Sequence, residues 1–64
     1  MENKQAFLTE KELSVYASIP LSTLRNWRFR GEGPPFKKPS SRMVRYSLNE
    51  FQEWMEKFTV LPFE

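Results

Sequence analysis

Apolar side chains recur every three or four positions in three short stretches of the chain, which is the spacing of one face of an α-helix. The first stretch predicts a helix over residues 10–17, with Leu13, Tyr16 and Ala17 facing inward. Thr9 and Glu12 stand three residues apart at its start. Each of these side chains can accept a hydrogen bond from the other's backbone N–H, which is the capping box that opens many helices.

The second stretch, residues 19–31, predicts a helix with a start signal and a stop signal. Pro20 suits its first helical position, where a proline loses no hydrogen bond, and Gly31 suits the residue just after its end. At about 100° per residue, Leu24 and Trp27 share one side with the stem of Arg28. The link to the first helix is so short that the two helices must cross steeply, as in a helix-turn-helix.

The opposite side of this second helix carries hydroxyl, amide and guanidinium groups, which are the groups that read base edges in a DNA major groove. A helix of this length measures about 16 Å and fits a groove about 12 Å wide. Taken alone, the stretch fits an ordinary surface helix with a solvated basic face equally well. The rest of the chain has to decide between these two interpretations.

A small β-hairpin is predicted after the second helix, because the prolines of the segment 33–35 forbid further helix. Residues 36–38 and 43–46 form its strands, and residues 39–42 have the composition of a turn, with an irregular loop as the alternative. Val44 and Tyr46 share one face of the second strand. An isolated hairpin is marginally stable, so this one must pack on the helices.

The third stretch predicts a final helix from Leu48 to about Lys57 or Phe58, opened by a second capping box of Ser47 and Glu50. One side of this helix forms an apolar stripe that we expect to belong to the core: Leu48, Phe51, Trp54, Met55 and Phe58. The tail, residues 59–64, is too apolar for a plain solvated end. It either folds back onto the core or contacts a partner.

With 64 residues the chain forms one domain, with a core at about residues 6–58, a flexible N-terminus at 1–5 and the apolar tail. It contains no cysteine and no histidine, so we expect neither disulfides nor a metal site, and no cofactor. No membrane-spanning run and no signal peptide are found, which favours a cytoplasmic, nucleoid-associated protein without a membrane partner. No arrangement of catalytic residues is found, so no enzymatic activity is expected.

Charge is distributed unevenly along the chain. Between residues 22 and 46 there are seven basic residues against one acidic residue, whereas the remainder holds three basic residues against seven acidic ones. A basic centre between acidic flanks is typical of a protein that binds a polyanion. The basic residues alternate with aromatic ones rather than forming a charged tail, which weakens the interpretation of a merely solvated charge run.

Several segments in combination resemble the excisionase-type, MerR-like winged-helix domain. The Ser-Thr-Leu-x-x-Trp block at residues 22–27, followed by Gly-Pro-Pro and Val-Arg-Tyr, carries most of the resemblance, which covers about residues 6–58. The group includes phage and integrative-element excisionases and small phage regulators of the AlpA type. The resemblance implies a mainly α winged helix-turn-helix, in which the second helix enters the major groove and the hairpin, as the wing, touches the DNA backbone or minor groove.

In lambda-type excisionases the positions that match Ser22 and Asn26 read bases, and an arginine that matches Arg42 enters the minor groove. This chain departs from the family at two of its helix positions. Pro20 replaces the usual serine cap, and Asn26 replaces a base-reading arginine, which moves the preferred base from guanine towards adenine. The family's last helix also tends to start nearer Asn49 than the capping signals predict here.

The predicted DNA-binding residues of the second helix contact base edges or adjacent phosphates: Ser22, Thr23, Arg25, Asn26, Phe29 and Arg30. Those of the wing contact mainly phosphates: Lys37, Lys38, Ser41, Arg42 and Arg45. The predicted function is an excisionase that binds double-stranded DNA cooperatively with further copies, bends it and acts beside an integrase or other recombinase. The alternatives are a transcriptional regulator of a phage or mobile element with the same fold, and a protein-binding adaptor that uses Phe29, Leu61 and Phe63.

Overall fold

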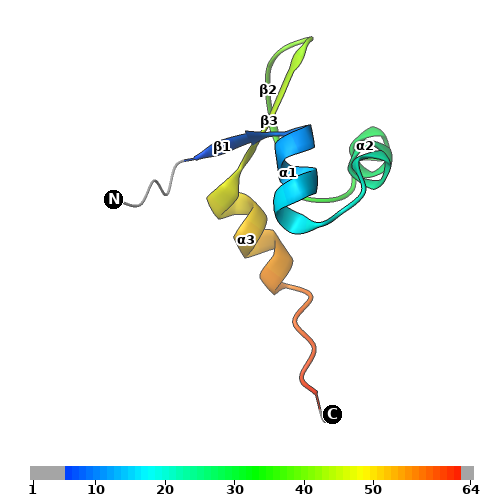
Figure 1. Ribbon diagram of the computed structural model, residues 1–64, viewed down its shortest axis with the longest axis vertical. Helices are drawn as coiled ribbons and strands as arrows, with labels where there is room; N and C mark the ends of the chain where they lie inside the picture. The colour runs from blue at the N-terminus through cyan, green and yellow to red at the C-terminus, as the bar shows by residue number, and fades with distance from the viewer. Residues whose placement is uncertain (1–5, 63–64) are drawn as a thin grey trace.

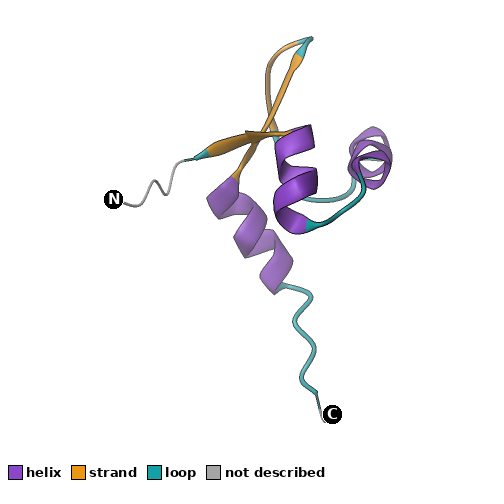
Figure 2. Ribbon diagram, viewed as in Figure 1, coloured by secondary structure: helices purple, strands orange, loops and turns teal. Residues whose placement is uncertain are grey.

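The computed structural model of the protein describes residues 6–62, so the predicted flexible N-terminus at residues 1–5 lies outside the described residues. Its elements follow the order β1 (Phe7–Thr9), α1 (Glu10–Ala17), α2 (Leu21–Phe29), β2 (Lys37–Ser40), β3 (Met43–Ser47) and α3 (Leu48–Glu56) (Figures 1 and 2). Three helices and a β-hairpin confirm the predicted winged helix-turn-helix. The hairpin, formed by β2, β3 and the turn between them, is called the wing below.

The strands form one antiparallel sheet in the order β1-β3-β2, whereas the sequence predicted only the hairpin. Strand β1 pairs with β3 from Phe7 opposite Ser47 to Thr9 opposite Arg45. The wing turn contains only Ser41 and Arg42, so the predicted four-residue turn was too long. Residues 39–40 belong to β2, an edge strand, where a proline costs no ladder hydrogen bond.

Helix α1 has the predicted bounds and the predicted capping box. The backbone N–H of Glu12 donates to Thr9 Oγ1 at 3.0 Å, and that of Thr9 donates to Glu12 Oε1 at 2.9 Å. Leu13 is fully buried, but Tyr16 is 54% exposed, so the prediction that Tyr16 faces inward was wrong. Tyr16 lies about 60° round the helix from Leu13, at the margin of the packed face, where its ring forms a T-shaped pair with Phe51 and its hydroxyl accepts a hydrogen bond from Gln52.

Helix α2 crosses α1 steeply, because the turn between them is short; in Figure 1, α1 stands upright while α2 is seen almost end-on. Leu24 is fully buried and Trp27 is partly buried against Trp54, with ring centroids 5.7 Å apart, as predicted. The helix begins at Leu21, so Pro20 is its N-cap rather than its first helical residue. The backbone of Pro20 is extended, with a ψ of 139°, and the Pro20 side chain makes no capping hydrogen bond.

The core consists of one residue from each helix and one from the wing: Leu13, Leu24, Tyr46 and Phe51. The rings of Phe36 and Tyr46 pack with centroids 5.9 Å apart, which attaches the base of the wing to this core. In α3, Phe51 is buried, but Met55 is 39% exposed, and Phe58, which follows the end of the helix, is 57% exposed. The predicted core stripe is therefore only partly confirmed.

The start of α3 differs in one detail from the predicted capping box. Ser47 is the N-cap, and its hydroxyl accepts a hydrogen bond from the backbone N–H of Glu50 at 3.3 Å, as predicted. The Glu50 carboxylate, however, accepts hydrogen bonds from Lys37 Nζ at 3.1 and 3.3 Å. It does not reach back to the backbone of Ser47, because a cation of the wing lies within its reach and forms the stronger, charge-assisted bond.

The chain after α3 extends away from the body of the molecule (Figure 1). Val60 is 82% and Leu61 60% exposed, so the described part of the tail does not fold back onto the core. Within residues 6–62, no helix has the length and hydropathy that a membrane span requires.

Candidate nucleic-acid interface

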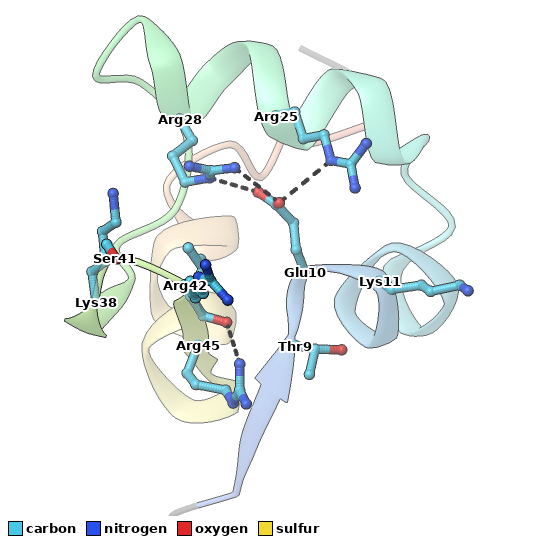
Figure 3. A pocket seen from close by; sticks show the side chains of 10 residues that line it. Thr9, Glu10, Lys11, Arg25, Arg28, Lys38, Ser41, Arg42 and Arg45 are labelled. Atoms are coloured by element: carbon cyan, nitrogen blue, oxygen red, sulfur yellow. Dashed lines mark hydrogen bonds and ion pairs between the residues drawn. The ribbon is translucent and has the colours of Figure 1, made fainter.

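Side chains from α1, α2, the wing and the end of β1 surround one open hollow of about 340 Å³, called the basic groove below (Figure 3). Six of its lining residues are cationic: Lys11, Arg25, Arg28, Lys38, Arg42 and Arg45. Glu10 is the acidic residue in the lining, and the remaining lining residues are Thr9, Ser41 and Val44. The groove brings together five of the candidate residues, one from α2 and four from the wing: Arg25, Lys38, Ser41, Arg42 and Arg45.

The other candidates of the predicted second helix lie outside the groove lining, and all of them except Thr23 are exposed; Arg30 is the C-cap of α2. Ser22 and Asn26 are exposed, and Phe29 is 77% exposed with the guanidinium of Arg28 at 5.1 Å from its ring centre. Arg30 is exposed and forms an ion pair with Glu32 at 3.3 Å. Thr23 is partly buried, and its backbone N–H donates to the carbonyl of Pro20. The polar face of α2 is thus open to solvent.

The wing candidates differ in how strongly the protein itself already engages them. Lys38 and Arg42 are exposed, and Arg42 stands at the two-residue turn. Arg45 is partly buried, and its Nη1 donates to the carbonyl of Val44 at 3.0 Å. Lys37 lies outside the groove lining and is paired with Glu50 of α3. A phosphate could engage Lys37 only in competition with this carboxylate.

A cluster around Glu10, which sequence reasoning missed, contributes Glu10, Arg25 and Arg28 to the groove lining. Arg28 donates two hydrogen bonds to the Glu10 carboxylate, from Nε at 2.9 Å and from Nη2 at 3.2 Å. The Tyr46 hydroxyl donates to Glu10 Oε2 at 3.1 Å, and Arg25 Nε lies 3.7 Å from Oε1. The sequence contains one indication of this cluster, because the helical spacing places the stem of Arg28 on the apolar side of α2. The residue that Arg28 bonds, Glu10, is 18 positions away along the chain.

The charges of this cluster are fixed at neutral pH. Burial raises the pKa of Glu10, but hydrogen bonds from Arg28 and Tyr46 and the charges of Arg28 and Arg25 outweigh it, so the pKa falls below its ordinary 4.5. The hydrogen bond with Glu10 raises the pKa of Arg28. Burial, together with the charge of Glu10, raises the pKa of Tyr46 to about 12. Glu10 is therefore an anion, Arg28 a cation and Tyr46 a neutral donor.

The acidic residues of α3 lie elsewhere on the surface. Glu53 and Glu56 are exposed, and neither of them, nor Glu50, lines the basic groove. Between residues 6 and 62, no group of three or more His, Cys, Asp or Glu side chains is placed to hold a metal ion. Five of the seven basic residues between positions 22 and 46 thus line the groove, whereas Arg30 and Lys37 lie outside it and Lys37 is paired with Glu50 of α3.

A steep two-helix turn, a third helix and a β-ribbon beside them define a winged helix-turn-helix protein. A family model for the helix-turn-helix domain matches residues 7–59, and the chain belongs to this family. The match extends from β1 to just beyond α3 and therefore includes the whole groove. Neither the comparison with curated proteins nor that with solved structures gave a significant match. The protein is thus a helix-turn-helix domain, and its family supports sequence-specific binding of DNA.

Proposed function

We propose that this protein is an excisionase, which binds DNA beside an integrase and directs recombination towards excision. The observation that carries the DNA-binding part is the basic groove, which brings arginines of α2 together with the cations of the wing beside the exposed Ser22 and Asn26. The excisionase role rests on the resemblance of the sequence, and the helix-turn-helix family includes excisionase- and AlpA-type members. A small transcriptional regulator of the same fold is the second candidate.

In this proposal α2 enters the major groove with its outer side towards the bases. Ser22 and Asn26 contact base edges, and an asparagine amide matches the paired donor and acceptor of adenine. Arg25, Arg30 and Thr23 contact bases or neighbouring phosphates. Ser22, Arg25 and Asn26 are exposed, which allows this approach without rearrangement of the helix.

The wing contacts the DNA backbone next to the site of α2. Lys38, Arg42 and Arg45 bind phosphates, with Ser41 beside them, and Arg42 at the turn reaches the minor groove. One phosphodiester strand then runs along the basic groove, between α2 and the wing. Lys37 takes part only if Glu50 releases it.

Neighbouring copies are proposed to bind side by side, because a single module of this size buries only roughly 600–1,000 Å² of protein on DNA. The apolar tail, together with the preceding Phe58, supplies a contact surface for a second copy or a recombinase, since Phe58, Val60 and Leu61 are exposed. The adaptor alternative would use the exposed Phe29 and Leu61 without DNA, whereas its third residue, Phe63, lies outside the described residues. The basic groove favours the DNA-binding interpretation.

Base reading by Asn26 is tested on a site selected from a random DNA pool. We expect Asn26→Ala to weaken binding to that site by about 1–3 kcal/mol and to relax the preference at one base pair. Lys38→Ala is the matched control, because losing a phosphate contact weakens binding to all sequences alike. For the wild type, with roughly 4–6 phosphates neutralised, the slope of log K against log salt is expected near −4 to −5. A slope near zero contradicts the proposal.

Cooperative binding is tested by titrating duplexes that carry one or two copies of the selected site. We expect the two-site duplex to fill cooperatively and to bend, as footprinting and gel mobility would show. Leu61→Ser is expected to abolish cooperativity and to keep the affinity for one site. Thr59→Ala is the control, since that hydroxyl donates only to the Glu56 carbonyl within the described chain. Independent filling of two sites on straight DNA contradicts the excisionase role and favours the regulator.

A further inference from the structure

We infer that Glu10 determines how well the protein distinguishes its specific DNA site from other DNA, by holding α2 and the wing at a fixed spacing. The inference rests on the proposed DNA contacts of α2 and the wing. Glu10 is a positioning residue in this role and does not touch DNA. Its carboxylate is the one negative group among the six cations of the basic groove lining.

Glu10 connects both DNA-contacting parts of the molecule. It is the first residue of α1, Arg28 joins it to α2, and Tyr46 joins it to β3 of the wing. Its side chain is only 12% exposed, and Tyr46 is 1% exposed, so water competes little for these bonds. Core packing of Leu24 against Tyr46 sets the approximate distance between α2 and the wing, and the Glu10 carboxylate adds directional bonds to both that fix it more narrowly.

The contacts of Glu10 with Arg28 and with Arg25 differ in strength. Arg28 donates twice to the carboxylate and is 17% exposed, so its charge is used within the protein. Arg25 lies at 3.7 Å and is 57% exposed, so it is oriented by Glu10 but remains accessible to a phosphate (Figure 3). Arg28 thus stabilises the fold through its bonds to Glu10, whereas Arg25 remains available to bind DNA.

The same charge opposes the approach of any phosphate. Phosphate contacts are independent of sequence, whereas base contacts require the helix to sit in one register. Removing the charge of Glu10 is therefore expected to strengthen the sequence-independent contacts with phosphates. It is also expected to loosen the spacing between α2 and the wing, on which the base contacts depend. A residue with a merely structural role would instead lower both affinities in parallel with the folded fraction.

The experiment compares the wild type and Glu10→Gln on the selected site and on a scrambled duplex at several salt concentrations. For Glu10→Gln we expect tighter binding to the scrambled duplex and a ratio of specific to non-specific affinity that falls about tenfold. The salt slope should steepen by about 0.9, because one further cation becomes available to phosphates. Glu53→Gln is the matched control, since it removes the same charge from an exposed site outside the groove.

Tyr46→Phe is the second variant, because it removes one hydrogen bond to Glu10 and leaves every charge in place. Its affinity ratio is expected to fall with an unchanged salt slope, and circular dichroism of each variant gives the folded fraction. If the folded Glu10→Gln protein matches Glu53→Gln in ratio and slope, the inference is wrong. Should Glu10→Gln fail to fold, an unchanged ratio in Tyr46→Phe overturns it. A wild type without preference for any selected site refutes the proposed function itself.

Discussion

Gly33→Ala is expected to destabilise the protein by about 2–4 kcal/mol, because a methyl group at this position meets both strain and overlap. The φ of Gly33 is +87°, a conformation that residues with a side chain rarely adopt. The added Cβ would lie 2.9 Å from Cβ and 3.0 Å from Cε3 of Trp27. That ring cannot simply move, because it packs against Trp54. The free energy of unfolding in urea, followed by tryptophan fluorescence, measures the loss.

Gly31→Ala is the matched control for this substitution. Its φ of +72° is equally unfavourable for alanine, but nothing lies within 4 Å of the added Cβ. We expect Gly31→Ala to lower the free energy of unfolding by about 1–2 kcal/mol, which is the cost of the left-handed backbone conformation alone. The difference between the two variants then reports the overlap with Trp27. Equal losses would show that Gly33 is needed for its backbone conformation only.

Raising the pH from 10 to 12 is expected to remove about 2 kcal/mol of stability from the wild type through Tyr46 alone. The pKa of Tyr46 rises from its ordinary 10.0 to about 12 in the folded protein, through burial and the nearby Glu10. The folded state therefore keeps a proton that the unfolded chain releases above pH 10. This stabilisation is complete below pH 10 and is lost as the pH rises through 12.

Urea unfolding of the wild type and Tyr46→Phe at several pH values isolates this contribution. At pH 8 the wild type is expected to be the more stable, because it keeps the hydrogen bond to Glu10. That advantage should shrink steadily above pH 10. Tyr16→Phe serves as the control for loss of a phenol, because Tyr16 is 54% exposed. A stability difference that stays constant up to pH 12 would refute the assignment.

Features that depend on neighbouring residues could be predicted from the sequence. The capping box of Thr9 and Glu12 fixed the start of α1, and the helical period of α2 identified Leu24 as buried and Asn26 as exposed. Periodicity does not say how wide a stripe the neighbouring elements will cover. For that reason Tyr16 was predicted to face inward, although it lies at the margin of the contact.

Features that join distant parts of the chain could not be predicted. Strand β1 has only three residues and exists because it pairs with β3. The bonds of Glu10 to Arg28 and Tyr46 span 18 and 36 positions, so no local pattern indicates them. Lys37 was predicted to bind a phosphate, because no local pattern shows its pairing with Glu50, which arises only when the wing packs beside α3.

The separation of the basic groove from the exposed acids of α3 affects how the protein meets DNA in solution. Unlike charges on different parts of a small body give it an electric dipole moment, and the field of a duplex exerts a torque on that moment. More collisions then begin with the cationic part towards the phosphates, which raises the association rate constant without any new contact. Because the field decays over about 8 Å at physiological salt, this gain is confined to the last approach.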